Sequence, residues 1–244
     1  SVIDNNTQTV TFTPLGTATK LSFTTQPGSA AAGVAFSPQP VIKILDASDN
    51  LVSAGPDATA LITLTVSSGT LRGTFSMQAV KGVADFKEKG INIQEAGIKT
   101  ITATKADTSS KAQGSPTLTQ DSASFVISAG TVSTDQSTLT ATAASSSVIA
   151  DGSSTYTVTV ALKDAFGNPI VGVKPVFVSS DTSDTITKPS RSTDATGTVT
   201  GSISASKAGT KTLSISSPTG LIDVTTSVAF VHGLASKLAF IKSP

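Results

Sequence analysis

The sequence contains no cysteine and no tryptophan, and it has a single histidine, His232. Without cysteine there can be no disulfide bond and no thiolate chemistry. Glutamate is nearly absent as well, because 14 of the 16 acidic residues are aspartate and only Glu88 and Glu95 are glutamate. Aspartate favours turns and helix caps, whereas long helices are rich in glutamate, so this balance disfavours a helical protein.

Charge and long apolar runs are also scarce. Charged residues make up 14% of the chain and the formal net charge is +1, which does not favour binding to nucleic acid or to an anionic membrane surface. No run of 18 apolar residues occurs, so we predict no membrane insertion, and SVIDNNTQTV at the start does not resemble a signal peptide. Threonine, serine, valine and glycine dominate instead, which is typical of strands and turns.

The clearest strand signal is STYTVTVAL, residues 154–162, in which Tyr156, Val158, Val160 and Leu162 alternate with threonine or alanine. Strict alternation predicts a strand with one buried face. Similar short segments are predicted as strands at residues 20–25, 41–45, 60–66, 99–104, 124–127, 175–179, 198–204, 211–215 and 224–231. Many short strands separated by glycine, proline, aspartate or asparagine predict an all-β sandwich or barrel.

The chain also resembles itself at a period of one small domain. LDASDNLV at 45–52 aligns with KDAFGNPI at 163–170 at a shift of 118, VKGV at 80–83 aligns with ATGT at 195–198 at 115, and AGIKTI at 96–101 aligns with AGTKTL at 208–213 at 112. Phe12, Phe125 and Phe230 each precede a glycine by a few residues and lie 113 and 105 residues apart. Several matches in the same order predict a tandem repeat.

The repeat divides the chain into four parts. We predict a terminal strand of an upstream domain at 1–16, one complete domain at 17–130, a second at 131–233, and the first strand of a following domain at 234–244. The last prediction rests on SKLAF at 236–240, which matches TKLSF at 19–23. The joins between the parts are short, and short joins restrict bending between domains, so a semi-rigid rod is expected.

Three segments of the second predicted domain resemble a known family. ADGSS at 150–154, DAFGNPIVG at 164–172 and TDATG at 193–197, in this order around the strand TYTVTVAL, are similar to bacterial immunoglobulin-like domains of the invasin/intimin type. Residues 17–130 fit a looser pattern, with KLSFTTQP and DASDN, where Asp49 stands for the motif's glycine and Leu51 for its proline. The resemblance implies tandem Greek-key β-sandwiches of about seven strands each, in a rod-like array outside a bacterial cell.

The motif residues allow a metal site as an alternative to a turn. Oxygen atoms of Asp46, Asp49, Asn50, Asp164 and Asn168 could bind calcium, which prefers such ligands. The acid spacing of a calcium-binding EF-hand loop is absent, however, and no bidentate glutamate follows. We therefore interpret both segments as turns, in which Asp164 would accept hydrogen bonds from backbone N–H groups, and Gly167 and Asn168 would tolerate positive φ. No other cofactor is expected.

Residues suited to catalysis are few. His232 lies in a predicted join, no G-x-S-x-G is present, and a carboxylate pair from Glu88 and Glu95 would lie in a polar segment. We therefore predict that this segment is not an enzyme.

Lys99 and Lys211 occupy matching places in the two domains. Each could form an intramolecular isopeptide bond, or could cover the sandwich with its stem and keep its ammonium in water. We expect the second arrangement, because no acid or asparagine partner can be identified from the sequence.

The sequence thus favours a non-catalytic structural segment of a secreted or cell-surface bacterial protein, acting as an adhesin stalk or spacer. Its partners would be the neighbouring Ig-like domains of the same chain. The alternative is a self-assembling filament or S-layer subunit, joined to copies of itself by lateral or donor-strand contacts. A third reading, a carbohydrate-binding module, needs exposed aromatic rings, and aromatic residues make up only 5% of the chain.

Overall fold

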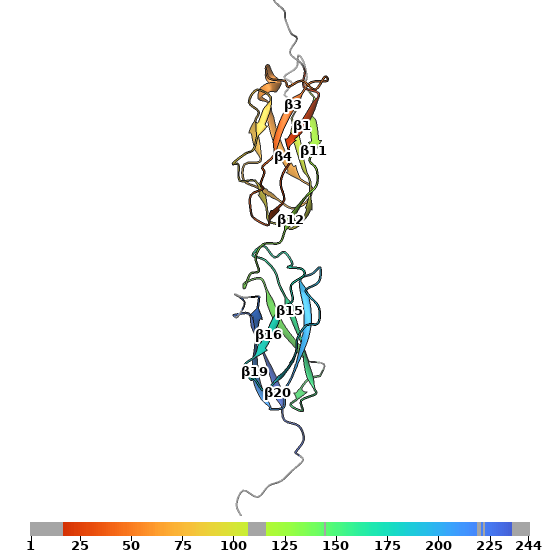
Figure 1. The fold of residues 1–244 in the computed structure, drawn as a ribbon, viewed down its shortest axis with the longest axis vertical. Coiled ribbons are helices and arrows are strands. Elements are labelled where there is room, and N and C mark those ends of the chain that lie inside the picture. Colours follow the sequence, from red (N-terminus) through yellow and green to blue (C-terminus); the bar gives the residue numbers. More distant parts are fainter. Residues whose placement is uncertain (1–16, 107–115, 144, 219–220, 222, 236–244) are drawn as a thin grey trace, which may run out of the picture. The chain divides into compact units, whose positions relative to one another are not determined.

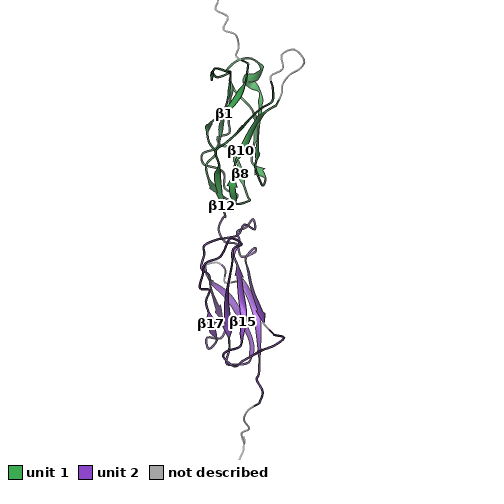
Figure 2. Cartoon of the chain, turned by 90° about the vertical axis from the view of Figure 1, so that its right-hand side faces the viewer, with its two compact units in different colours: residues 1–128 green, residues 129–244 purple. Residues whose placement is uncertain are grey.

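The computed structural model describes residues 17–106, 116–143, 145–218, 221 and 223–235. The chain folds into two compact units, residues 1–128 and residues 129–244 (Figures 1 and 2). The described residues form strands and one short 3-10 helix, η1 (Pro56–Thr59), so the predicted all-β class is confirmed. The predicted strand at 1–16 lies outside the described residues, as does the predicted strand at 234–244 apart from its first two residues. The predicted boundaries 17–130 and 131–233 stay a prediction. No helix of the described part could cross a membrane.

The described part of unit 1 contains twelve strands in four small sheets. The strands are β1 (Lys20–Thr25), β2 (Ala30–Ala31), β3 (Val41–Leu45), β4 (Leu61–Val66), β5 (Leu71–Arg72), β6 (Ser76–Gln78), β7 (Val83–Asp85), β8 (Asn92–Ile93), β9 (Gly97–Lys99), β10 (Ile101–Lys105), β11 (Leu118–Asp121) and β12 (Phe125–Ser128). Their orders are β1-β3-β7, β11-β10-β4-β6, β2-β12-β9 and β5-β8.

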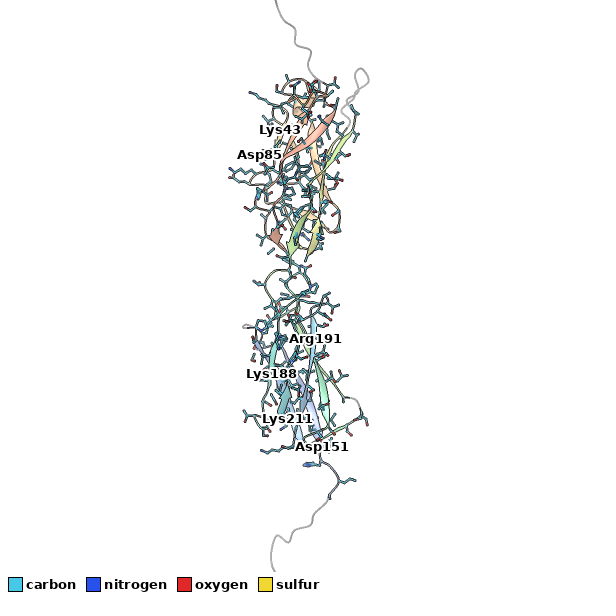
Figure 3. All side chains as sticks on the ribbon, turned by 45° about the vertical axis from the view of Figure 1, so that its right-hand side comes forward. Lys43, Asp85, Asp151, Lys188, Arg191 and Lys211 are labelled. Carbon is cyan, nitrogen blue, oxygen red and sulfur yellow. The ribbon has the colours of Figure 1, made fainter. Side chains whose placement is uncertain are left out.

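A single core fills unit 1. In β3, Ile42 and Ile44 are fully buried, and they belong to the same cluster as Ile62 of β4 and Ile101 of β10. These residues come from different sheets, so the sheets pack as a sandwich. Lys43, between the two isoleucines, lies on the other face of β3 (Figure 3). Alternation along the strand therefore decides which side chains enter the core.

Among its described residues, unit 2 has eight strands in two four-stranded sheets. The strands are β13 (Thr138–Ala143), β14 (Val148–Ile149), β15 (Thr155–Ala161), β16 (Val176–Ser179), β17 (Thr185–Thr187), β18 (Thr198–Ser204), β19 (Gly209–Ser217) and β20 (Thr225–Val231). The sheet orders are β13-β15-β18-β17 and β14-β20-β19-β16.

The core of unit 2 follows the alternation of STYTVTVAL. Val158, Val160 and Leu162 are fully buried and pack in one cluster with residues of the other sheet, such as Phe230 of β20. The ring of Tyr156 meets Phe230 edge-on, with 5.2 Å between centroids, and the Tyr156 hydroxyl donates a hydrogen bond to a backbone oxygen of β20. Tyrosine thus buries its ring and satisfies its polar end.

The three internal sequence matches have equal backbone geometry in the two units. The bridge between Leu45 and Leu51 corresponds to the bridge between Lys163 and Pro169 at the shift of 118. Gly82 and Gly197, at the shift of 115, have φ of 78° and 77°. The carbonyl oxygen of Gly82 accepts the backbone N–H of Ile44, and that of Gly197 accepts the backbone N–H of Leu162. The shift of 112 joins Gly97 and Gly209, with φ of 130° and 134°, so it too relates equivalent backbone positions.

The phenylalanine match is out of register by two residues. Gly97 lies opposite Ile127, whereas its counterpart Gly209 lies opposite Phe230. Phe230 therefore corresponds to Ile127 and not to Phe125. A shift of two residues keeps a side chain on the same face of a strand, so both phenylalanines are buried and the sequence alone could not reveal the error.

Candidate functional site

The motif DAFGNP forms a turn closed by the Asp164 carboxylate. Asp164 Oδ1 accepts the backbone N–H groups of Phe166 and Asn168, each at 2.9 Å. Asp164 Oδ2 accepts the Asn168 side-chain amide at 2.8 Å and the backbone N–H of Gly130, 34 residues earlier, also at 2.8 Å. The residue is only 1% exposed. Four donors thus surround one buried carboxylate, which is how a buried charge is tolerated.

These contacts also set the acidity of Asp164. Burial acts to raise the pKa of its carboxyl group, but the hydrogen bonds from Asn168, Gly130 and Phe166 outweigh burial and hold the pKa below its ordinary value. The group is therefore a carboxylate in the folded protein at neutral pH.

The corresponding turn of unit 1 has the same backbone pattern on a more exposed carboxylate. Asp46 Oδ1 accepts the backbone N–H groups of Ser48 and Asn50 at 2.9 Å, and Asp46 Oδ2 accepts the Asn50 amide at 3.2 Å. Asp49 takes the place of Gly167 with φ of 68°, against 83° for the glycine, a conformation that aspartate tolerates better than most residues. Its carboxylate lies 2.6 Å from Lys20 Nζ.

The five calcium candidates therefore lie in two separate turns. Asp46, Asp49 and Asn50 belong to unit 1, whereas Asp164 and Asn168 belong to unit 2. N–H donors occupy the carboxylates of Asp46 and Asp164, and no group of three or more acidic or histidine side chains suited to a metal occurs in the described part of the chain. The geometry fits a pair of hydrogen-bonded turns better than it fits a cation site, and calcium binding stays a hypothesis for titration.

Two further aspartate turns in unit 2 were not predicted as sites of interaction. Asp151 accepts the backbone N–H groups of Ser153 and Ser154 at 2.8 and 2.6 Å (Figure 3). Asp194 accepts those of Thr196 and Thr198 at 2.9 and 3.1 Å. Hydrogen bonds, first from the Thr196 hydroxyl and then from the backbone, lower the pKa of Asp194 to about 2. The signal was available in the sequence, since aspartate followed by serine, threonine or glycine favours such turns.

Lys211 differs from expectation, because its ammonium is buried and paired. The residue is 5% exposed, and its Nζ lies 2.5 Å from Asp181 Oδ2 and 3.5 Å from Asp184 Oδ1 (Figure 3). The hydrogen bond with Lys211 is the main reason that the pKa of Asp181 lies far below its usual range, and the same bond raises the pKa of Lys211. The prediction of a solvated ammonium is wrong here. The pair is held in its ionised form, which disfavours an isopeptide bond because that reaction needs a neutral amine.

Lys99 is buried at the corresponding place of unit 1, and no acid of the described residues forms an ion pair with it. It is 4% exposed, and its Nζ donates to Ser68 Oγ at 2.9 Å. Ser67 donates its backbone N–H to the Thr100 carbonyl and accepts the Thr100 N–H on its hydroxyl, and Ser180 makes the same two contacts with Thr212. Ser67 thus corresponds to Ser180, and the next residue, Ser68, corresponds to Asp181. The sequence could have predicted that both lysines are buried, because residues two apart in a strand point to the same face. Each lysine lies two residues before a core residue, Ile101 or Leu213.

An open groove of about 420 Å³ lies between the start of β13 and the start of β20. Leu139 and Val224 form its apolar part, and Asp135 and Asp223 add two carboxylates. The remaining lining consists of hydroxyl groups from Thr134, Ser137, Thr138, Thr140 and Thr225. The groove contains neither His232 nor a glutamate, so the residues considered for catalysis are not brought together there.

Comparisons with known proteins agree with this description of unit 2. Residues 136–231 match the family described as bacterial Ig-like domain (group 1). The search of curated proteins found no match.

Among solved structures, the chain is similar to three surface proteins. The first is invasin, a bacterial integrin-binding protein, with 21% identity over 88% of this chain and 40% of that chain and a TM-score of 0.45. The second is FdeC, an Escherichia coli adhesin, with 19% identity over 89% and 65% and a TM-score of 0.42. The third is InvD of Yersinia pseudotuberculosis, with 18% identity over 91% and 60% and a TM-score of 0.48.

This chain thus spans less than two thirds of each of those chains, and the identities and TM-scores are too low to carry an argument about function. The family match has a firmer basis, because it covers the aspartate turn, both sheets and the core of unit 2. The resemblance seen in the motifs of residues 150–197 is confirmed, because residues 136–231 match the model of the bacterial Ig-like domain (group 1).

Proposed function

We propose that this chain is a non-catalytic structural segment of a secreted or surface-exposed bacterial protein, in which it acts as a stalk or spacer. The observation that carries the proposal is the use of the motif carboxylates. Asp164 is the most distinctive acidic residue of the chain, yet four donors from the protein itself occupy its oxygen atoms. A residue used in this way holds a turn and leaves no oxygen for a substrate.

Other polar groups of unit 2 support the same proposal. The carboxylates of Asp151 and Asp194 close their own turns, and Asp181 is paired with Lys211. The match of residues 136–231 to a family of bacterial Ig-like domains favours a place outside the cell. The proposed setting is comparable to that of invasin, an integrin-binding protein, and FdeC, an adhesin, but the proposal rests on the family match and not on these two likenesses.

A self-assembling filament or lattice is the second candidate. Strands β13 and β17 are the outer strands of one sheet of unit 2, and each pairs with a single neighbour in the described part. A sheet edge of this kind can accept a strand from another chain. Three of the similar solved structures are of an S-layer protein.

Sedimentation velocity of the purified chain separates the two candidates. A spacer is expected to sediment as a monomer of 24.4 kDa at micromolar concentration, because its function needs no lateral contact. Ordered polymers or sheets that grow with protein concentration would refute the spacer function and support the lattice.

A further inference from the structure

The chain is held by unit 1 up to Ser128. Strand β12 ends at this residue, where Ser128 lies opposite Ala31 of β2. Its carbonyl oxygen accepts the backbone N–H of Ala32 at 2.8 Å. Backbone hydrogen bonds of this kind hold a strand end in the sheet, so Ser128 moves with unit 1.

The first hydrogen bond of the chain with unit 2 is made two residues later, at Gly130. The backbone N–H of Gly130 donates to Asp164 Oδ2 at 2.8 Å. Two more contacts follow, a bridge between Val132 and Asp164 and the hydrogen bond from Ser133 N–H to the Lys163 carbonyl at 2.8 Å. The chain from Gly130 onward is therefore tied to the end of β15 and to the turn that follows it.

Ala129 alone separates the two held residues. A single residue contributes two soft backbone dihedral angles. If the bond between Gly130 and Asp164 were lost, the next contact of unit 2 would be the bridge at Val132, and the stretch between the held residues would grow to 129–131. Three times as many dihedral angles would then be free.

We infer that Asp164 is a junction clamp, a positioning residue that fixes the chain where it joins unit 2 and limits motion between the units. Its two oxygen atoms have separate tasks. Oδ1 closes the turn through Phe166 and Asn168, and Oδ2 holds Gly130. The inference names the residue that would stiffen the proposed spacer, but its measured consequences do not depend on what the protein does.

Asp194 shows that an aspartate turn can form without a hydrogen bond to a distant backbone N–H such as that of Gly130. Its Oδ1 also accepts two backbone N–H groups within its own turn, from Thr196 and Thr198. Its second oxygen accepts the Thr198 hydroxyl of the same turn at 3.2 Å. Asp194 lies in unit 2 as well, so it provides a matched control for Asp164.

The inference is tested on the whole chain with the variant Asp164→Asn. Asparagine keeps an oxygen that can close the turn, but its NH₂ group would face the Gly130 N–H, which is also a donor. Amide hydrogen exchange by NMR should show that Gly130 exchanges about tenfold faster than in the wild type or more. Nitrogen-15 relaxation should show that the two units tumble more independently. Asp194→Asn should change neither quantity.

Two results would overturn the inference. One is that Asp164→Asn leaves Gly130 exchange and the tumbling of the units as they are in the wild type, or that Asp194→Asn changes both equally. The other needs no variant, and so applies even if Asp164→Asn does not fold: the Gly130 amide of the wild type exchanges as fast as in an unstructured peptide. Polymerisation in the sedimentation experiment would refute the spacer function but would leave this test intact.

Discussion

Lys211 Nζ lies 2.5 Å from Asp181 Oδ2, and this ion pair ties β19 to the loop that follows β16. Unit 1 has the same buried lysine at Lys99 but offers it the hydroxyl of Ser68 in place of a carboxylate. The same buried lysine position thus has a charged partner in unit 2 and a neutral partner in unit 1. Substituting the neutral partner by a charged one tests what the charge contributes to stability.

The variant Ser68→Asp should stabilise unit 1. A carboxylate at this place would neutralise the Lys99 ammonium as Asp181 neutralises Lys211, and because residue 68 is exposed the gain should be about 0.5–1 kcal/mol in the free energy of unfolding. Urea unfolding followed by NMR signals of unit 1 measures the gain. Ser68→Asn, which has nearly the same shape but no charge, should not reproduce it, and the gain should vanish when Lys99 is changed to Met.

Acid should destabilise unit 2 more than unit 1. In unit 2 the pKa is lowered for Asp151, Asp164, Asp181 and Asp194, and in unit 1 it is lowered for Asp46. A carboxyl group with a depressed folded-state pKa contributes stability above its unfolded pKa of 3.8 and loses it as pH falls toward the folded value, which is about 2 for Asp194.

Thermal unfolding between pH 6 and pH 2 measures this difference, with NMR signals used to follow each unit separately. The melting temperature of unit 2 should fall further than that of unit 1, and most of the fall should occur below about pH 4. Equal losses in the two units would contradict the assignment of these carboxylates as the acid-sensitive groups.

Strand patterns predicted from the sequence succeeded where apolar alternation was strong. Residues 154–162 gave the strand β15 and the buried side chains of Val158 and Val160 as expected. Strand β13, TLTATA, was missed although it alternates too, because alanine takes the inward places after Leu139 and contributes little apolar contrast. Two-residue strands such as β5 and β8 carry no periodic signal at all.

The junction could not be predicted, for a different physical reason. Sequence reasoning identified Asp164 as a turn residue because its partners Phe166 and Asn168 are near neighbours. The bond to Gly130 spans 34 residues and exists only because the chain that enters unit 2 runs beside the end of β15. Such a contact depends on the tertiary arrangement, which local propensity does not encode.

Gly201 should be essential for the packing of unit 2. A Cβ atom at this position of β18 would lie 2.5 Å from the Thr187 carbonyl oxygen and 2.8 Å from a ring carbon of Phe177. Gly201→Ala should therefore push β17 away or displace a fully buried ring, at about 1–3 kcal/mol in the free energy of unfolding.

Gly167→Ala is the matched control, since a Cβ there meets open space and only the positive φ of 83° is unfavourable. Its cost should be about 1 kcal/mol, from backbone strain alone. Chemical denaturation of both variants gives the comparison, and a Gly201→Ala protein as stable as the wild type would contradict the packing described for β17 and β18.

Calcium should have no effect on the melting temperature. N–H donors already occupy the oxygens of Asp164 and Asp46, so a cation would have to displace them. Scanning calorimetry in millimolar calcium chloride and in EDTA tests this expectation. A large calcium-dependent rise that disappears in Asp164→Ala would show that this turn is a metal site.

The proposed spacer function is tested most directly by the reach of the protein from the cell surface on which we propose that it stands. Unit 2 would be deleted in one variant and replaced by an unrelated β-sandwich of equal length in another, and the height of a terminal tag above the cell surface would be measured. We predict that deletion lowers the tag by roughly 30–40 Å, one domain length, and that replacement restores it. An unchanged height after deletion, or a loss of the protein's activity that the replacement domain does not restore, would contradict the spacer function.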